Sequence, residues 1–230
     1  MDRRMKAQTQ SFRKNLKEKR QNEVQDEILR VAARLFAQHG YRAVTIDMVS
    51  EDMGYSKSSI YYYFKNKEEI LWRVFDTIYE TYVTSAQETR DEFKGPVQTM
   101  RDLIQQHLIT VMEHHDWTTI FFQNEGELSK DRQRLIRNRK RAYNAILETV
   151  YKEGVSAGVF RDIPPHIAVN GILGMCNSVF VWYDELRSTK AEEVAAHFVS
   201  LLTYGYQLQA VGAERGGATD RSLSVAAPAQ

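Results

Sequence analysis

Apolar residues recur along most of the chain at spacings of three and four, which is the period of an α-helix. The first series predicts a helix over about 22–39 and consists of Ile28, Val31, Ala32, Leu35 and Phe36. Gly40 is placed to end that helix. Thr45 and Ser56 are good N-caps for two short helices, one at about 46–53 and one starting at 57.

The same period continues to about residue 210. It predicts a long helix opened by the capping-box sequence Asn66-Lys-Glu-Glu69, then helices at about 96–115 and 117–125, one from about 130 to between 154 and 158, and helices at about 164–187 and 190–210. No run alternates with the period of a strand over several residues. We therefore expect an all-α fold of about nine helices, divided into a basic disordered arm (1–21), a three-helix domain (22–69), a larger helical domain (70–211) and a disordered tail (212–230).

The segment from Thr45 to Lys67 has the features of a helix-turn-helix. Gly54 supplies the turn between the two short helices, and Ile60 and Phe64, four residues apart, face inward on the second helix. The remaining residues of that helix are left to face a major groove. They are Ser56, Lys57, Ser58, Ser59, Tyr61 and Tyr62. Thr45 and Lys67 stand at helix N-termini, which favour phosphate.

This segment resembles the N-terminal domain of the TetR family of transcriptional repressors, through the run Gly40-Tyr-Arg-Ala-Val-Thr-Ile46 and the run from Gly54 to Ile70. The resemblance implies phosphate contacts from Thr45, Tyr62 and Lys67, and groove contacts from Lys57, Ser58, Ser59 and Tyr61. Tyr63 stands where the family often has His, so this ring either contacts DNA or packs in the domain. By the same resemblance, the rest of the chain is expected to bind a small effector and to form a homodimer on a palindromic operator of double-stranded DNA.

The residues from Ile167 to Tyr183 are apolar on nearly every side of a helix, so this segment is expected to be buried. At 17 residues, with polar side chains among them, it is shorter than the ~20 residues of a membrane span. We expect it to form a four-helix dimer interface with the last helix. The alternative is an ordinary monomer core.

Aromatic and polar side chains of the second domain are candidates for the effector site, because pockets combine apolar walls with a few polar groups. The candidates are Phe75, Tyr79, His107, Trp117, Phe121, Phe122, Glu125, Arg137, Arg139, Lys140, Tyr143, Asn144, Asn177 and Trp182. The run from Lys130 to Arg141 holds seven basic residues and one acid. It is either a solvated face or a site for ligand phosphates. This run and its flanking segments are similar to the acyl-CoA-responsive branch of the family, and the alternative effector is a hydrophobic drug of an efflux system.

Composition adds bounds to this interpretation. The net charge is only +1, yet residues 1–22 hold eight Lys or Arg against two acidic residues, which is typical of a nucleic-acid-binding arm. A single cysteine and the lack of a signal peptide or membrane span predict a cytoplasmic protein. Gly154-Val-Ser-Ala-Gly158 matches a hydrolase nucleophile pattern but follows a helix instead of the strand that this motif needs. We therefore expect no catalytic residue, metal or cofactor.

Overall fold

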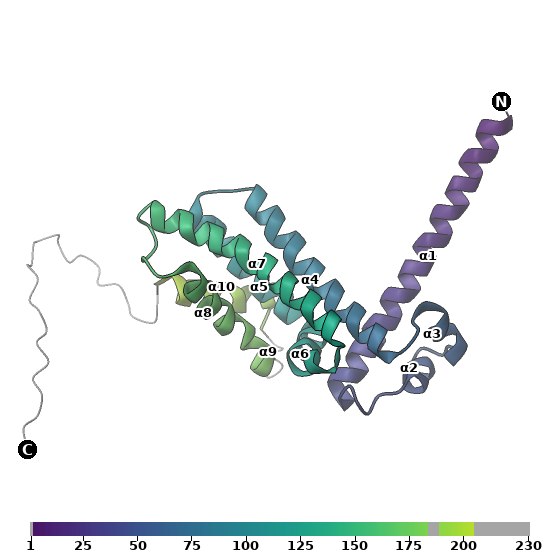
Figure 1. Cartoon of the computed structure of the whole chain (residues 1–230). Helices are drawn as coiled ribbons and strands as arrows, with labels where there is room; N and C mark the ends of the chain where they lie inside the picture. Colours follow the sequence, from purple (N-terminus) through teal and green to yellow (C-terminus); the bar gives the residue numbers. More distant parts are fainter. Residues whose placement is uncertain (1, 184–188, 205–230) are drawn as a thin grey trace, which may run out of the picture.

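The computed structural model describes residues 2–183 and 189–204, with side chains from residue 15 onward, and within these residues every regular element is helical. The predicted all-α class is thereby confirmed. A small head consists of α1 (Asp2–His39), α2 (Ile46–Asp52) and α3 (Lys57–Tyr63) (Figure 1). The body consists of α4 (Lys67–Asp91), α5 (Pro96–Glu113), α6 (His115–Asn124), a 3-10 turn η1 (Glu125–Glu127), α7 (Lys130–Ser156), α8 (Pro165–Asn177), α9 (Val179–Trp182) and α10 (Ala191–Tyr204).

Helix α1 begins twenty residues earlier than its apolar series predicts. The disordered arm expected at 1–21 is wrong for residues 2–21, which continue α1 as one helix that projects from the head (Figure 1). Residues 2–39 contain no glycine or proline, so nothing in the backbone ends the helix. The tail expected at 212–230 lies outside the described residues.

The predicted helix starts are confirmed by their caps. Thr45 Oγ1 accepts a hydrogen bond from Met48 N at 3.3 Å, and Ser56 Oγ accepts one from Ser59 N at 3.2 Å. Gly54 makes the turn between α2 and α3 with φ at +66°, a conformation that favours glycine. These local signals fix where the three head helices meet.

Two apolar cores hold the fold, and α4 belongs to both. The first joins buried residues of α1, α2 and α3 to Phe75 and Tyr79 of α4 and to Phe121 of α6. The second joins Ala86 of α4 to α5, α7, α8 and α10. The core of the head therefore continues into the body without a polar boundary.

Helices α4 and α7 run parallel, side by side, and three ion pairs set their register. Near the head, Arg132 Nη1 lies 3.3 Å from Glu68 Oε1, and further along Arg139 pairs with Asp76. At the far end the charges are exchanged, with Arg90 Nη2 2.5 Å from Glu153 Oε1. Ion pairs at partly buried positions are weak evidence for stability, but this charge order disfavours any other register.

The apolar segment after Pro164 is not one continuous helix. Helix α8 ends at Asn177, and the short α9 follows after Ser178. Ser178 Oγ donates to Met175 O at 2.7 Å, a local bond of the kind that competes with helical hydrogen bonding. The last predicted helix is seen as α10, and its expected extension to residue 210 lies outside the described residues.

The glycines of the G-x-S-x-G pattern have structural roles at the end of α7. A Cβ on Gly154 would come within 2.0 Å of the Phe160 ring, and Gly158 has φ at +68°. Ser156 is the last residue of α7. The pattern thus marks a helix end instead of a nucleophile turn.

Candidate DNA-binding surface and effector cavity

Helix α3 presents four exposed side chains on its outer face: Lys57, Ser58, Tyr61 and Tyr62. Lys57 Nζ lies 2.9 Å from Asp47 Oδ2, an exposed pair of the kind that contributes little stability and is readily exchanged for another partner. Tyr62 is 68% exposed, and its hydroxyl accepts a hydrogen bond from Gln21 Nε2 at 3.0 Å. The outer face of α3 is therefore a polar, aromatic surface without a covering element.

Two residues of the expected DNA set lie apart from this face. Ser59 is half-buried, and its hydroxyl is 2.8 Å from the hydroxyl of Ser56. The Ser59 hydroxyl is therefore hydrogen-bonded at the N-terminus of α3. Tyr63 is half-buried and packs against the first core, so it has the packing role, and its contact with DNA stays a prediction. Inward position on the helix explains both outcomes.

Lys67 was expected to contact phosphate, and the structure gives its ammonium a different role. Lys67 Nζ donates to the carbonyls of Tyr41, Arg42 and Val44 at 2.8, 3.2 and 2.8 Å. Each of the three N–H groups of the Lys67 ammonium therefore has a carbonyl acceptor. Burial lowers the pKa of this amine. Lys67 fixes the α1–α2 loop to the start of α4.

Substitution of Lys67 separates these two roles. We expect Lys67→Met to lower the free energy of unfolding by about 1–3 kcal/mol, because three carbonyls lose a charged donor. The slope of log K against log salt for a random DNA duplex should stay unchanged. Lys57→Met is the control and should reduce that slope by roughly 0.9 with little effect on stability. Urea unfolding and fluorescence anisotropy between 50 and 200 mM salt measure both; a reduced slope for Lys67→Met would restore the phosphate role.

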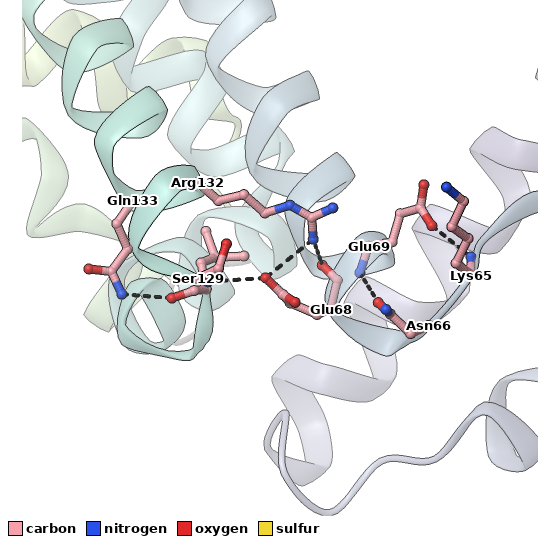
Figure 2. Close-up of polar contacts among 8 residues, drawn as sticks. Lys65, Asn66, Glu68, Glu69, Ser129, Arg132 and Gln133 are labelled. Atoms are coloured by element: carbon pink, nitrogen blue, oxygen red, sulfur yellow. Dashed lines mark hydrogen bonds and ion pairs between the residues drawn. The ribbon is translucent and has the colours of Figure 1, made fainter.

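A polar junction joins the head to the start of α7 (Figure 2). Glu68 Oε1 accepts from Ser129 N at 3.0 Å, and Arg132 Nη1 donates to Glu68 O at 3.1 Å. In the head loop, Arg42 Nε lies 2.8 Å from Glu127 Oε1 of η1. The first turn of α4, directly after α3, is therefore bonded to the first turn of α7.

The first turn of α4 is also held from the head side. Asn66 Oδ1 accepts from Glu69 N at 2.8 Å, and Glu69 Oε2 accepts from Lys65 N at 2.6 Å, as Figure 2 shows. The predicted capping box is present, with Glu69 reaching back to Lys65 instead of Asn66. One turn of helix thus carries bonds to the loop that follows α3 on one side and to the start of α7 on the other.

The body contains a cavity of about 290 Å³ between α4, α5, α6, α7 and α8. Its walls combine aromatic and aliphatic side chains with polar groups that are neutral apart from one lysine. The lining residues are Ile78, Tyr79, Tyr82, His107, Thr118, Phe121, Phe122, Lys140, Tyr143, Asn144, Asn170, Leu173, Gly174 and Asn177. The volume is about twice that of a ~150 Å³ cavity that binds benzene, so it suits a small apolar group.

A buried polar chain crosses the cavity wall. His107 Nε2 lies 2.9 Å from Asn177 Oδ1, and His107 Nδ1 lies 2.9 Å from the Tyr143 hydroxyl. Because an amide oxygen only accepts, Nε2 carries the proton and Nδ1 accepts from Tyr143. Burial lowers the pKa of His107 from 6.5 to about 4, so the ring is neutral at physiological pH.

His107 should make the stability of the fold depend on pH. The unfolded chain protonates this residue near its ordinary pKa of 6.5, whereas the folded chain does so only near 4. Its stabilising contribution is therefore complete above about pH 6.5 and is lost as pH falls towards 4, by up to about 3 kcal/mol. We expect His107→Gln to flatten the curve of melting temperature against pH between 7 and 4.5, and the exposed His166→Gln to leave it as it is. Parallel curves for wild type and His107→Gln would refute this.

Eight of the fourteen expected ligand residues line the cavity: Tyr79, His107, Phe121, Phe122, Lys140, Tyr143, Asn144 and Asn177. Phe75 is fully buried in the first core, and Trp182 stacks on Phe198 with 5.7 Å between ring centroids. Trp117 lines a separate opening beside Arg30. These three were reasonable aromatic candidates, but helix rotation turns them away from the cavity.

The remaining expected ligand residues belong to the charged surface of α7 and its partners. Glu125 Oε2 lies 2.6 Å from Lys140 Nζ, and Arg139 pairs with Asp76, so both are held by ion pairs. Arg137 is exposed. The basic run is thus partly structural and partly solvated.

Six lining residues were missed from the sequence: Ile78, Tyr82, Thr118, Asn170, Leu173 and Gly174. Asn170, Leu173, Gly174 and Asn177 follow one another at three, one and three residues along α8 and so share one face of the helix. Because Asn177 was expected to line the cavity, its helical spacing could have predicted the other three. Ile78 and Tyr82 likewise flank Tyr79 on α4. Which of these side chains reach the cavity depends on how α4 and α8 pack, and this packing cannot be read from the residue types.

A three-helix head with a helix-turn-helix, joined by one long helix to a helical body with a cavity, defines a one-component transcriptional regulator. Residues 28–74 match the model of bacterial regulatory proteins of the tetR family, and residues 94–206 match a tetracyclin repressor-like C-terminal domain. The chain belongs to the TetR family. It is a regulator and not an enzyme, as are the proteins to which it is similar.

Three comparisons illustrate this membership. A TetR/AcrR-family regulator from Thermobifida fusca is 31% identical, with a TM-score of 0.66 and coverage of 81% of this chain and 100% of that one. The repressor KstR2 of Mycolicibacterium smegmatis is 23% identical over 78% of this chain and 89% of its own length. AibR, solved in complex with isovaleryl coenzyme A and operator DNA, shares the fold with a TM-score of 0.70 at 20% identity, covering 78% of this chain and 97% of AibR.

Over the described residues, no helix is both long enough and apolar enough to cross a membrane.

Proposed function

We propose that this chain is a homodimeric repressor that binds a palindromic operator through α3 and leaves it when an acyl-CoA enters the body. The observation that carries the proposal is a neutral aromatic cavity whose walls Tyr79 and Phe121 are also members of the head core. A ligand that moves these rings acts directly on the packing of the DNA-binding head.

The acyl group is assigned to the cavity. Its walls are aromatic and aliphatic, and its volume of about 290 Å³ suits a group of roughly two benzene rings. The hydroxyl of Thr118 and the amides of Asn144 and Asn170 are neutral groups that can bond a thioester carbonyl. Coenzyme A itself is much larger than the cavity, so its nucleotide must remain outside.

The phosphates of coenzyme A are assigned to the outer face of α7. Arg137, Arg141 and Asn144 are spaced by four and three residues and so share one face of the helix. Both arginines are exposed, and Asn144 lines the cavity. The proposal is supported by this spacing, which sets two exposed arginines on the face of α7 that bears a cavity residue.

The alternative effector, a hydrophobic cationic drug, is less well matched. The described lining residues include no carboxylate, and the charged member is Lys140. Burying a cation beside an ammonium costs free energy unless an anion compensates it. A neutral hydrophobic drug remains an outcome that the experiment below distinguishes.

The dimer is supported by apolar surface that one chain leaves exposed. On α8, Ile167 is 56% exposed and Met175 48%, and on α10 Leu201 is 46% exposed. Residues of both helices line one shallow groove. Contiguous apolar surface of this kind marks an interface, and a two-fold dimer would carry two α3 helices to half-sites ~34 Å apart.

The function is tested with an operator selected from random duplexes by the full-length protein. Octanoyl-CoA should weaken operator binding and raise the melting temperature, whereas free octanoate and a hydrophobic cation should do neither. Arg137→Gln/Arg141→Gln should weaken octanoyl-CoA binding roughly fivefold to tenfold. The same variant should bind the phosphate-free N-acetylcysteamine thioester like wild type. Lys130→Gln/Lys152→Gln removes equal charge elsewhere on α7 and is the control.

Each contrary result has a defined meaning. Release by a neutral drug but not by any CoA ester would replace the effector class. Failure to enrich any operator would overturn the regulator itself. Equal loss of both thioesters in Arg137→Gln/Arg141→Gln would move the phosphates away from α7.

The junction of α4 and α7 should transmit the effector signal. We expect Arg132→Gln to leave effector affinity nearly unchanged and to lower the effector-induced change in operator affinity at least threefold, because Glu68 loses its bonded partner on α7. Arg134→Gln is the control, since Arg134 Nη2 pairs, at 3.2 Å, with Asp131 Oδ1 on the same helix. Operator affinity is measured with and without octanoyl-CoA. An unchanged ratio for Arg132→Gln would exclude this junction from the coupling.

A further inference from the structure

The net positive charge of this chain is concentrated in the first half of α1. Residues 1–22 carry a net charge of +6, against +1 for the whole chain, which leaves −5 for the remainder. The structure makes residues 2–21 the first half of α1, a segment that we call the N-terminal arm. In Figure 1 this arm projects from the head, away from the body.

Five of the eight basic residues of the arm are spaced in the sequence so that they fall on one face of a helix. Positions 3, 6, 13, 17 and 20 are spaced by three, seven, four and three residues, which places them in a single stripe along a straight helix. Lys14 falls at the edge of the stripe, and Arg4 and Lys19 fall outside it. Lys17 and Arg20, the stripe members nearest the head, are exposed. A periodic stripe differs from the scattered charge of an ordinary solvated helix.

The stripe continues into contacts that fix its direction. Gln21 and Val24 follow Lys17 and Arg20 by four residues each, so they prolong the same face. Gln21 Nε2 donates to the exposed Tyr62 hydroxyl at 3.0 Å, and Val24 packs against the head core. The basic face of the arm therefore points to the side of α1 on which the recognition helix lies.

We propose that the N-terminal arm is a second DNA-binding element, which lies along the phosphate backbone of the DNA that flanks the half-site. The inference rests on the proposed function in that α3 must bind an operator. Twenty helical residues span ~30 Å, or about nine base pairs of duplex. Arm contacts go to phosphates and so add affinity and salt dependence without adding sequence preference.

Three proteins test the proposal: full-length wild type, the stripe variant and an off-stripe control. The stripe variant carries Arg3→Gln, Lys6→Gln, Arg13→Gln, Lys17→Gln and Arg20→Gln, since glutamine keeps helix propensity. The control carries Arg4→Gln and Lys19→Gln. Binding is measured by anisotropy between 50 and 200 mM KCl. The duplexes contain the selected operator with flanks of zero or ten base pairs on each side, and a random duplex is included.

Wild type should bind the flanked operator at least tenfold more tightly than the trimmed one, and the stripe variant should show no such gain. On the flanked operator the salt slope of the stripe variant should fall by about 4–5 for each arm that engages, and that of the control by less than 2. Circular dichroism and melting temperature report whether the variants keep the fold. If the stripe variant loses helix, Lys17→Gln/Arg20→Gln is compared with the control, since each removes two charges.

Equal slopes and equal flank dependence in wild type and stripe variant would overturn the proposal while leaving operator recognition by α3 intact. If the stripe variant lost binding to vesicles of anionic lipid while its salt slope on DNA stayed equal to that of wild type, the proposal would be overturned in favour of a membrane partner. If no operator is enriched, the proposed function fails, whereas the salt slope on the random duplex still decides whether the arm contacts DNA.

Discussion

Helix α4 is packed into two cores at once, and this shared membership is the constraint on which the rest of the molecule depends. Its first half is buried with α1, α2 and α3, through residues such as Phe75, and its second half, at Ala86, is buried with the body. Cores are close-packed, so neither end of α4 can shift without a response from its neighbours. The head therefore has no hinge of its own at Lys67, where three carbonyl bonds hold the preceding loop to the helix.

The charge order along α4 and α7 narrows the motions that remain. Glu68 faces Arg132 near the head, Arg90 faces Glu153 at the far end, and a slide of one turn would separate both pairs. A displacement of α4 therefore takes α7 with it or breaks the pairs. A ligand can shift an equilibrium only through its differential affinity for the two states. In the proposed function this difference would arise in the cavity between these helices, and Tyr79 and Phe121, which line the cavity and belong to the head core, would transmit it to the head.

The parts of this structure that local signals govern were predictable from the sequence. Caps at Thr45, Ser56 and Asn66, and the turn at Gly54, follow from side chains that bond their own backbone within a few residues. The role of Lys67 was not predictable, because its acceptors lie more than twenty residues earlier and depend on how the α1–α2 loop folds back. The cavity was found in part for the same reason: aromatic residues such as Trp117 and Trp182 look alike in the sequence, and only the rotation of their helices decides which rings reach the ligand space.

The basic residues of the chain show how position decides the role of one residue type. Arg132 and Arg139 face acidic residues of α4 and are used to hold two helices in register, so they are poor candidates for a phosphate. Arg137 and Arg141 belong to the same run of α7 but are exposed, where a charged ligand group can reach them. The basic stripe on α1 differs from both of these groups. Its residues keep a helical spacing along a part of α1 that lies beyond the head core, so packing does not explain the spacing. Because an exposed helix gains nothing in folding from such a stripe and loses free energy to repulsion between like charges at i and i+4, an anionic partner of matching length is the physical reason to keep it.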